Sequence, residues 1–241
     1  MLTKKITAAA VLILLVISLA GCSNLPTAGN GQTTDGSYTF TGAVSAINIT
    51  GVPATVNLTP DSTGAVTYTI DENLKPLLDI SYQDGTLNIA TKNGKSIVSD
   101  KIVLNIGADS LAALSVDGAA DIQGSGTFTA DSFDLKINGA GSANLALAAQ
   151  SVSLTLNGAG DITLSGAADT LSINSSGAAK ADTRGLIAQD VTVALNGVGS
   201  IQLHAEKTLD ATVNGMGSVT YWGDPVLSQS TQGLASVKKG G

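Results

Sequence analysis

Side chains capable of acid–base chemistry are sparse in this sequence. His204 is the only histidine and Arg184 the only arginine among the 241 residues. A histidine that acts as a general base needs a second group to orient its ring, and the sequence offers no evident partner beside His204. We therefore interpret His204 as a solvated surface residue. The sequence indicates no catalytic residue, and we expect the chain not to be an enzyme.

Two aspartates raise the question of a metal site, because Asp121 and Asp161 occupy the same position in a repeat described below. Carboxylates stacked in a row are typical of calcium-binding repeats. The other copies of that position hold Ser142, Lys180, Ser200, Ser218 and Ser236. A lysine in the row disfavours a shared cation, so we expect neither a metal nor a cofactor.

The only tryptophan, Trp222, allows two interpretations. An exposed indole ring could stack on a sugar. A ring in this place is more often used to close the end of the hydrophobic core, here beside Tyr221. The sequence alone leaves both alternatives open.

The residue with the clearest chemistry is Cys22, the only cysteine. Lys4 and Lys5 precede a run of small and apolar residues, 8–20, which is typical of a secretory signal and short for a membrane span. The ending Leu-Ala-Gly-Cys at 19–22 resembles the lipobox of bacterial lipoproteins. This resemblance implies cleavage before Cys22 and a lipid on its thiol, which makes the membrane a partner of the protein.

The predicted signal peptide bears on where the protein is located and on the net charge of the mature chain. Residue 23 is serine, not the aspartate associated with retention in the inner membrane of Gram-negative bacteria. We thus expect the bacterial cell envelope, and the outer membrane if the source is Gram-negative. Cleavage removes two lysines and no acid, so the formal charge falls from −7 to −9. Such an acidic chain offers no basic patch for nucleic acid.

The chain divides into three parts by composition. Residues 1–21 are the signal peptide, and residues 22–37, rich in Gly, Ser, Thr and Asn, predict a flexible tether. Residues 38–241 are long enough for a single domain. Within it, 38–107 alternate irregularly, and we interpret them as irregular first coils that act as a cap. Residues 108–237 hold the regular repeats.

The repeats are seven copies of a polar residue, glycine, two small residues and then Ser, Asp or Lys. Their first glycines are Gly118, Gly139, Gly158, Gly177, Gly197, Gly215 and Gly233, with nearly equal spacings along the chain. An asparagine precedes four of them: Asn138, Asn157, Asn196 and Asn214. A period of roughly 20 residues is typical of a solenoid, in which each coil buries its apolar face against its neighbours.

Apolar and polar residues alternate on both sides of each glycine, which predicts two short strands per coil joined at a glycine corner. Gly tolerates the positive φ of such a corner, and stacked asparagines could hydrogen-bond along the coils. We therefore predict an all-β fold, a parallel β-helix-like solenoid of about 18–21 residues per coil. The alternative is an antiparallel meander, because Asn-Gly between alternating runs is also a strong hairpin signal. Ser175 stands where a large apolar residue is expected, so its coil should have the thinnest core.

These segments together resemble a known family, the putative auto-transporter adhesin head domain or GIN domain. The resemblance spans about residues 38–237. It rests on the Gly-x-Gly-Ser/Asp copies and on three segments, 38–40, 84–89 and 219–225. Ala120 and Ala179 depart from the pattern by replacing the second glycine, and Gln232 begins a weak last copy. The resemblance implies a secreted or lipid-anchored bacterial β protein, and it supplies no site residues.

Two functional hypotheses follow. The first is a lipid-anchored, non-catalytic envelope protein, adhesin-like or scaffolding, which binds a glycan or a protein through the sides of the solenoid. The second is a carbohydrate-active enzyme of the β-helix type. The second hypothesis lacks the clustered Asp, Arg and Lys that such enzymes carry on one face.

The lipid anchor yields a direct prediction. Cys22→Ser should leave an uncleaved precursor that takes up no labelled fatty acid, because the acyl chains have lost their attachment atom. Metabolic labelling followed by gel electrophoresis measures both effects. Equal labelling of the wild type and the variant would refute the assignment.

Overall fold

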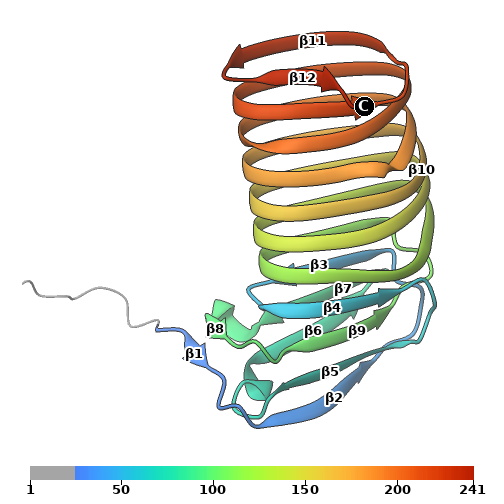
Figure 1. Cartoon of the computed structure of the whole chain (residues 1–241). Helices are drawn as coiled ribbons and strands as arrows, with labels where there is room; N and C mark the ends of the chain where they lie inside the picture. Colours follow the sequence, from blue (N-terminus) through green and yellow to red (C-terminus); the bar gives the residue numbers. More distant parts are fainter. Residues whose placement is uncertain (1–24) are drawn as a thin grey trace, which may run out of the picture.

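The computed structural model describes residues 25–241, so the signal segment and Cys22 lie outside the described residues. The prediction of an all-β fold is confirmed (Figure 1). The strands are β1 (Thr27–Ala28), β2 (Thr33–Thr39), β3 (Ala46–Thr50), β4 (Ala54–Thr59), β5 (Ala65–Asp71), β6 (Leu78–Gln83), β7 (Thr86–Thr91), β8 (Ile97–Val98), β9 (Val103–Gly107), β10 (Ala113–Trp222), β11 (Val226–Gly233) and β12 (Ser236–Lys239). Two 3₁₀ turns, Lys75–Leu77 and Lys92–Gly94, interrupt them.

The segment β10 is 110 residues of continuous extended chain that winds through successive stacked coils (Figure 1). Its first residues pair in parallel with β3 and β4, and its last coil pairs in parallel with β11 and β12. The register at the C-terminal end joins equivalent residues of successive coils, such as Leu209 with Leu227 and Ser218 with Ser236. The sheet therefore curls on itself until its cross-section is nearly closed.

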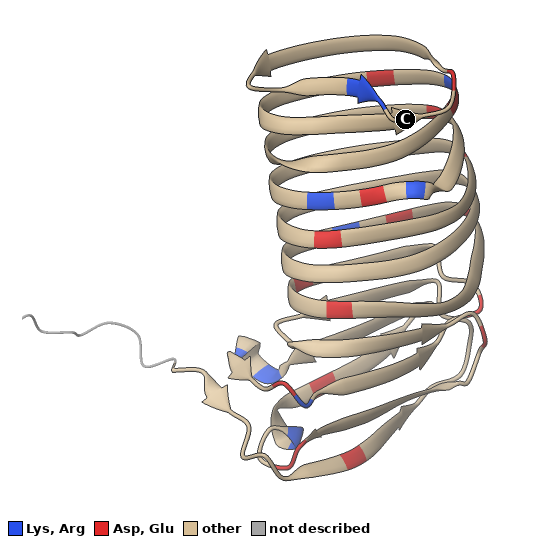
Figure 2. Ribbon diagram, viewed as in Figure 1, with Lys and Arg blue, Asp and Glu red and all other residues tan. Residues whose placement is uncertain are grey.

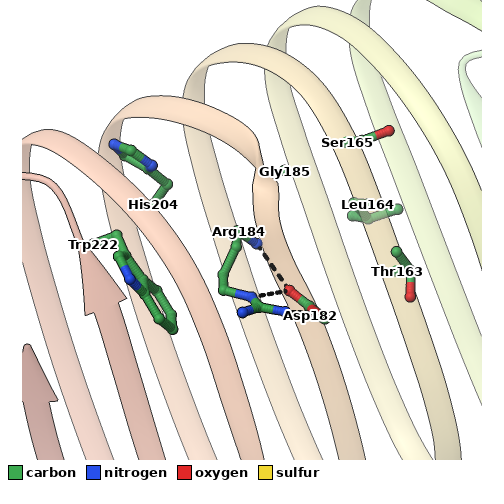
Figure 3. Close-up of a pocket in the computed structure, with 8 residues that line it drawn as sticks. All are labelled: Thr163, Leu164, Ser165, Asp182, Arg184, Gly185, His204 and Trp222. Carbon is green, nitrogen blue, oxygen red and sulfur yellow. Dashed lines mark hydrogen bonds and ion pairs between the residues drawn. The ribbon is translucent and has the colours of Figure 1, made fainter. Parts of the chain in front are cut away.

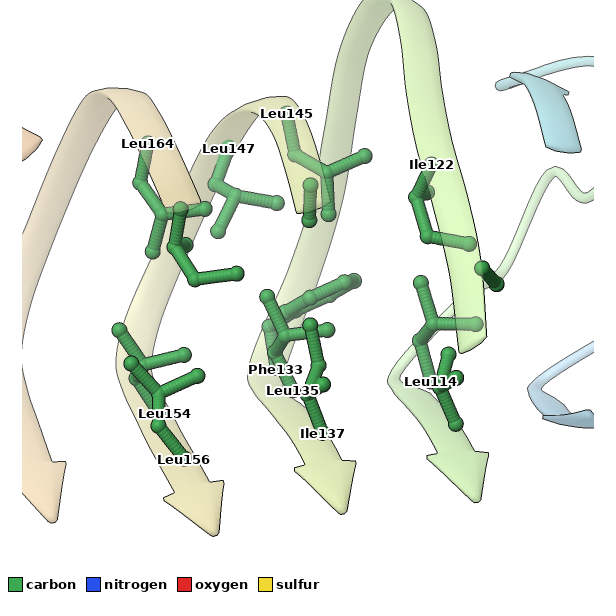
Figure 4. Close-up of a cluster of buried hydrophobic side chains, with 14 of the residues drawn as sticks. Leu114, Ile122, Phe133, Leu135, Ile137, Leu145, Leu147, Leu154, Leu156 and Leu164 are labelled. Atoms are coloured by element: carbon green, nitrogen blue, oxygen red, sulfur yellow. The ribbon is translucent and has the colours of Figure 1, made fainter. Parts of the chain in front are cut away.

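Side chains alternate between a buried and an exposed face, as the sequence predicted. The apolar positions on either side of the glycine corners are buried, and they fill the interior of the coils (Figure 4). They include Leu114, Val116, Leu135, Ile137, Leu154, Leu156, Ile162, Leu164, Val193, Leu195, Ile201, Leu203 and Val219. Ser175 is buried among them, and its Oγ has no hydrogen-bond partner. A buried unpaired hydroxyl costs free energy, so this coil has a weak point in its core.

The glycine corners show why the repeat needs glycine. All seven first glycines have positive φ, from 87° at Gly233 to 145° at Gly197. A Cβ added to Gly158 would collide with the backbone carbonyl oxygen of Gly139, one coil earlier. Residues other than glycine are therefore excluded from this corner for two reasons. The positive φ is unfavourable for them, and their Cβ would collide with the backbone of the neighbouring coil.

The residues before these glycines form hydrogen-bonded rows along the stack. The amide of Asn157 donates to Oδ1 of Asn138 at 2.9 Å, and the hydroxyl of Ser176 donates to Oδ1 of Asn157 at 2.7 Å. Asn214 donates in the same way to Asn196 at 2.8 Å. These bonds satisfy polar groups at the corner and link each coil to the next.

The N-terminal end differs from the regular coils. Strands β3 and β4 lie in parallel register with β7 and β9, which continues the stack. Antiparallel pairing then joins β2 to β5, β5 to β9, and β6 to β7. The antiparallel strands β2 and β5 close this end of the stack (Figure 1).

The prediction of an unfolded tether over residues 22–37 is wrong where β1 and β2 lie. β2 pairs with β5 along its whole length, and Asp71 accepts a hydrogen bond from the backbone N–H of Gly31 at 2.7 Å. Thr69 also donates to Asp35 at 2.7 Å. The composition suggested disorder because it holds few apolar groups. An edge strand gains its stability largely from main-chain bonds to a strand already in place.

The C-terminal coil has polar residues at inward positions. Gln229 and Thr231 align with Ala211 and Val213 of the preceding coil, both of which are fully buried. A terminal repeat with a polar outer face keeps a stacked core soluble. Within residues 25–241, no helix is both long enough and apolar enough to cross a membrane.

The glycine corner generates a stability prediction. Gly158→Ala should cost about 2–4 kcal/mol, because the new methyl group meets both an unfavourable φ and the carbonyl of Gly139. Gly94 is a matched control, with φ of 62° and no neighbouring atom within 4 Å of its Cβ position. Gly94→Ala should cost about 1 kcal/mol from φ alone. Chemical denaturation measures both, and equal costs would show that the stacked backbone is not the constraint.

Candidate functional site

The only arginine, the only histidine and the only tryptophan lie beside one another on successive coils (Figure 3). Arg184, His204 and Trp222 each follow a corner glycine at the same offset, counting from Gly177, Gly197 and Gly215. Because equivalent positions of successive coils stack, this shared offset brings the three side chains to one flank of the molecule. They lie near a second bend of the coil, marked by the positive φ of Gly166 and Gly223.

Arg184 is held in place by two neighbours. Its Nε and one terminal nitrogen donate to the two carboxylate oxygens of Asp182 at 2.9 and 2.6 Å. Its guanidinium carbon lies 5.2 Å from the centre of the Trp222 ring, which is within the range of a cation–π contact. Hydrogen bonding to Arg184 lowers the pKa of Asp182 below its usual range, so this carboxylate is ionised at neutral pH.

His204 has a partner that the sequence analysis did not identify. Its Nε2 lies 2.9 Å from a carboxylate oxygen of Glu206, two residues further along the chain. In an extended strand, residues two apart point to the same face, so this pair is local. His204 is a surface residue, as the sequence predicted, with 27% of its side chain exposed, and Glu206 is a charged neighbour of its ring.

Trp222 lines the outer flank, whereas Tyr221 packs against the core. The C-terminal residues fix the indole ring. Its Nε1 donates to the carbonyl of Gly241 at 3.3 Å, and the backbone N–H of Gly240 donates to the carbonyl of Tyr221 at 2.8 Å. A Cβ on Gly240 would overlap the ring, so the chain end lies directly against it. The protein's own residues thereby fix the orientation of the ring.

These side chains border an open hollow of about 460 Å³, which we name the Trp222 hollow. Its lining comprises Thr163, Leu164, Ser165, Asp182, Arg184, Gly185, His204 and Trp222. Figure 3 shows them distributed over neighbouring coils, with no side chain at Gly185. The hollow combines an aromatic ring, a guanidinium–carboxylate pair and two hydroxyls. Such a set can bind a polar ligand through hydrogen bonds and contact with the aromatic side chain.

The other candidate residues lie elsewhere. Asp121 lies at a glycine corner, where it accepts hydrogen bonds from Ser142 and Gln123. Residues 25–241 contain no cluster of three or more His, Cys, Asp or Glu side chains arranged for a metal ion. The seven corner glycines and the asparagines before them form the stacked corner described above. Charged side chains are spread over the coils (Figure 2).

A family model described as "Putative auto-transporter adhesin, head GIN domain" matches residues 45–225. The chain belongs to this family. The resemblance drawn from the sequence is confirmed, with somewhat narrower limits than the 38–237 predicted. The GIN-domain family is of adhesin type and indicates a cell-surface or envelope protein.

Solved structures share the fold of this GIN domain. A putative adhesin from Bacteroides fragilis is 23% identical, with a TM-score of 0.78 over 88% of this chain and 99% of that one. A putative adhesin from Parabacteroides merdae is 22% identical, with a TM-score of 0.68 over 89% and 99%. A protein from Parabacteroides distasonis described as a putative lipid binding protein is 21% identical, with a TM-score of 0.68 over 90% and 100%. No curated protein matches the chain.

The ion pair in the Trp222 hollow generates a pH prediction. A lowered pKa means that the Asp182–Arg184 contact persists above the ordinary aspartate value of 3.8 and is lost only as the pH falls below it. Trp222 is the only tryptophan, so its fluorescence should show an acid transition below about pH 4, where Asp182 takes up a proton and releases Arg184.

Asp182→Asn should remove that transition. Asp224→Asn is a matched control, because Asp224 also has a lowered pKa through its pairing with Lys239 but does not line the hollow. The same acid transition in Asp182→Asn as in the wild type would contradict the assignment.

Proposed function

We propose that this protein is a lipid-anchored, non-catalytic module of the bacterial cell envelope that binds a glycan through the flank of its coils. A protein ligand is the alternative. The observation that carries the proposal is the Trp222 hollow, which gathers an oriented aromatic ring and hydrogen-bonding groups on an outer surface. Membership of an adhesin-type family supports the same conclusion.

The position of the hollow fits an anchored protein. β1 begins shortly after Cys22 and lies at the end of the stack where β2 and β5 are found (Figure 1). Trp222 ends β10 and adjoins the opposite, C-terminal end of the stack. A lipid on Cys22 would hold the first end near the membrane, and the coils would present the hollow farther from it.

The alternative of a carbohydrate-active enzyme is disfavoured by the charges in the hollow. A glycosidase needs a carboxylic acid with a raised pKa to protonate the leaving group. The pKa of Asp182 is lowered by Arg184 instead, and Asp182 is the only carboxylate among the described residues that line the hollow. Asp182 is therefore unsuited to protonate a leaving group, and the hollow is better suited to binding.

We also infer that residues 113–239 form a parallel β-helix-like solenoid. The parallel registers of β10 with β3, β4, β11 and β12 support this topology. Spin labels at Lys136, Thr155, Asn174, Ala194 and Thr212 should then show distances that grow by about 4.8 Å per coil. Steps of about two strand spacings would indicate antiparallel hairpins and overturn the solenoid.

A glycan array tests the proposed function. The mature chain from Cys22, purified in a zwitterionic detergent without a sugar headgroup, should bind a subset of glycans and release no shorter product from them. Heat-denatured chain is the control, because binding should require the assembled flank. Failure to bind any glycan would refute glycan recognition, and release of product detected by mass spectrometry would refute the non-catalytic assignment.

A further inference from the structure

We propose that the Trp222 hollow binds a neutral sugar ring with adjacent hydroxyl groups and discriminates against acidic sugars and phosphate. The inference rests on the proposed function and specifies its ligand. It is drawn from the balance of charge in the hollow, the rigidity of its aromatic wall and the hydrogen-bonding groups at its edge.

The charge of the hollow argues against an anionic ligand. Its lining contains one guanidinium, Arg184, and one carboxylate, Asp182, and these two groups already pair through two hydrogen bonds. An anion would have to displace Asp182 from Arg184 and would then face an unpaired carboxylate. Outside the lining, Glu206 adds a negative charge close to His204, and Lys180 adds a positive charge that acts on Asp182, so these two neighbours add no net charge. A neutral ligand avoids the repulsion from the unpaired carboxylate.

The wall of the hollow is held in place by the protein's own residues. Trp222 and the guanidinium of Arg184 lie one over the other, with 5.2 Å between the guanidinium carbon and the ring centre. Asp182 fixes Arg184 on one side, and the chain end at Gly240 and Gly241 fixes the indole on the other. A wall that is already ordered loses little conformational entropy when a ligand binds.

The edge of the hollow offers both donors and acceptors. Asp182 can accept hydrogen bonds from two neighbouring hydroxyls, and Arg184 has N–H groups beyond the two that Asp182 uses. Thr163 and Ser165 add hydroxyls from the preceding coil. Adjacent sugar hydroxyls, which both donate and accept, match this mixed set.

Intrinsic fluorescence provides a direct test, because Trp222 is the only tryptophan. The mature chain, in the same sugar-free detergent, is titrated with neutral probes (glucose, galactose, mannose and their short oligomers), with glucuronic acid and with inorganic phosphate. We expect a saturable change with at least one neutral probe and binding at least about tenfold weaker for the two anions.

Variants locate the site. Thr163→Leu places an apolar side chain in the hollow without removing Trp222, Arg184 or Asp182, and it should weaken binding at least about tenfold. Thr155→Leu, on the outward face of the preceding strand segment, is the matched control and should bind as the wild type does. Arg184→Lys keeps the charge but loses the flat, two-pronged contact, so it should also weaken binding about tenfold. Circular dichroism and thermal melting establish that each variant is folded, and Arg184→Lys tests the site if Thr163→Leu does not fold.

The outcomes separate the two proposals. Glycan binding on the array with no fluorescence response, or with binding unchanged in both Thr163→Leu and Arg184→Lys, would overturn this inference and leave the proposed function standing. Tighter binding of glucuronic acid or phosphate than of every neutral probe would overturn the ligand class. Absence of both array binding and fluorescence response would refute both proposals.

Discussion

The close approach of one coil's backbone to the next at the glycine corner constrains the rest of this structure. The carbonyl oxygen of Gly139 occupies the space in which a side chain at position 158 would begin, and the same relation holds between Gly158 and Gly177. Since no other residue fits there, the corner recurs at each coil and fixes where each coil turns. The buried positions are then set by their distance from the corner, and the interior fills with Leu, Ile and Val.

The same constraint explains how a site can form from residues far apart in the sequence. Once the corners are aligned, any two residues at the same distance from their corner become neighbours. Arg184, His204 and Trp222 share such a distance and come from three successive coils. Arg184 also reaches across the coil of His204 to the ring of Trp222. A ligand in the hollow would therefore contact several coils at once, and its binding would depend on their stacking.

Much of the regular region could be predicted because its signals are periodic. The glycine spacings, the alternation around them and the asparagine rows all follow from one repeated geometry. The hollow carried a periodic signal as well, since Arg184, His204 and Trp222 are spaced along the chain as the neighbouring corner glycines are. What the sequence could not indicate is the pairing within the hollow. The contact of Arg184 with Trp222 depends on side-chain conformation, and the fixing of the indole depends on the path of the last residues.

The ends of the stack were harder to predict than its middle for a different reason. In the middle, each coil has two similar neighbours, so the pattern of one copy supports that of the next. At the N-terminal end, β2 pairs on one edge only and with a strand of opposite direction, so it carries no repeat signal and little apolar content. At the C-terminal end, Gln229 and Thr231 break the alternation because that coil faces solvent. A prediction from composition depends on the apolar residues that a strand buries. The stability of these end strands comes instead from main-chain pairing with a neighbouring strand that has already formed.

Because both ends of the stack are covered, the outward-facing flanks of the coils are the surface on which side chains can vary without changing the fold. Inward residues must pack and corner residues must be small, but an outward side chain between corners contacts mainly its equivalents one coil away. At the glycine corners, small polar side chains form rows with their equivalents, as Asn138, Asn157 and Ser176 do. At the flank near the second bend, larger side chains take the equivalent positions, and Gly185, which carries no side chain, lies directly beside Ser165. Because these changes lie outside the core, a site can be built on the flank without weakening the stack that supports it, and we expect functional differences between similar coiled domains to reside in such outward positions.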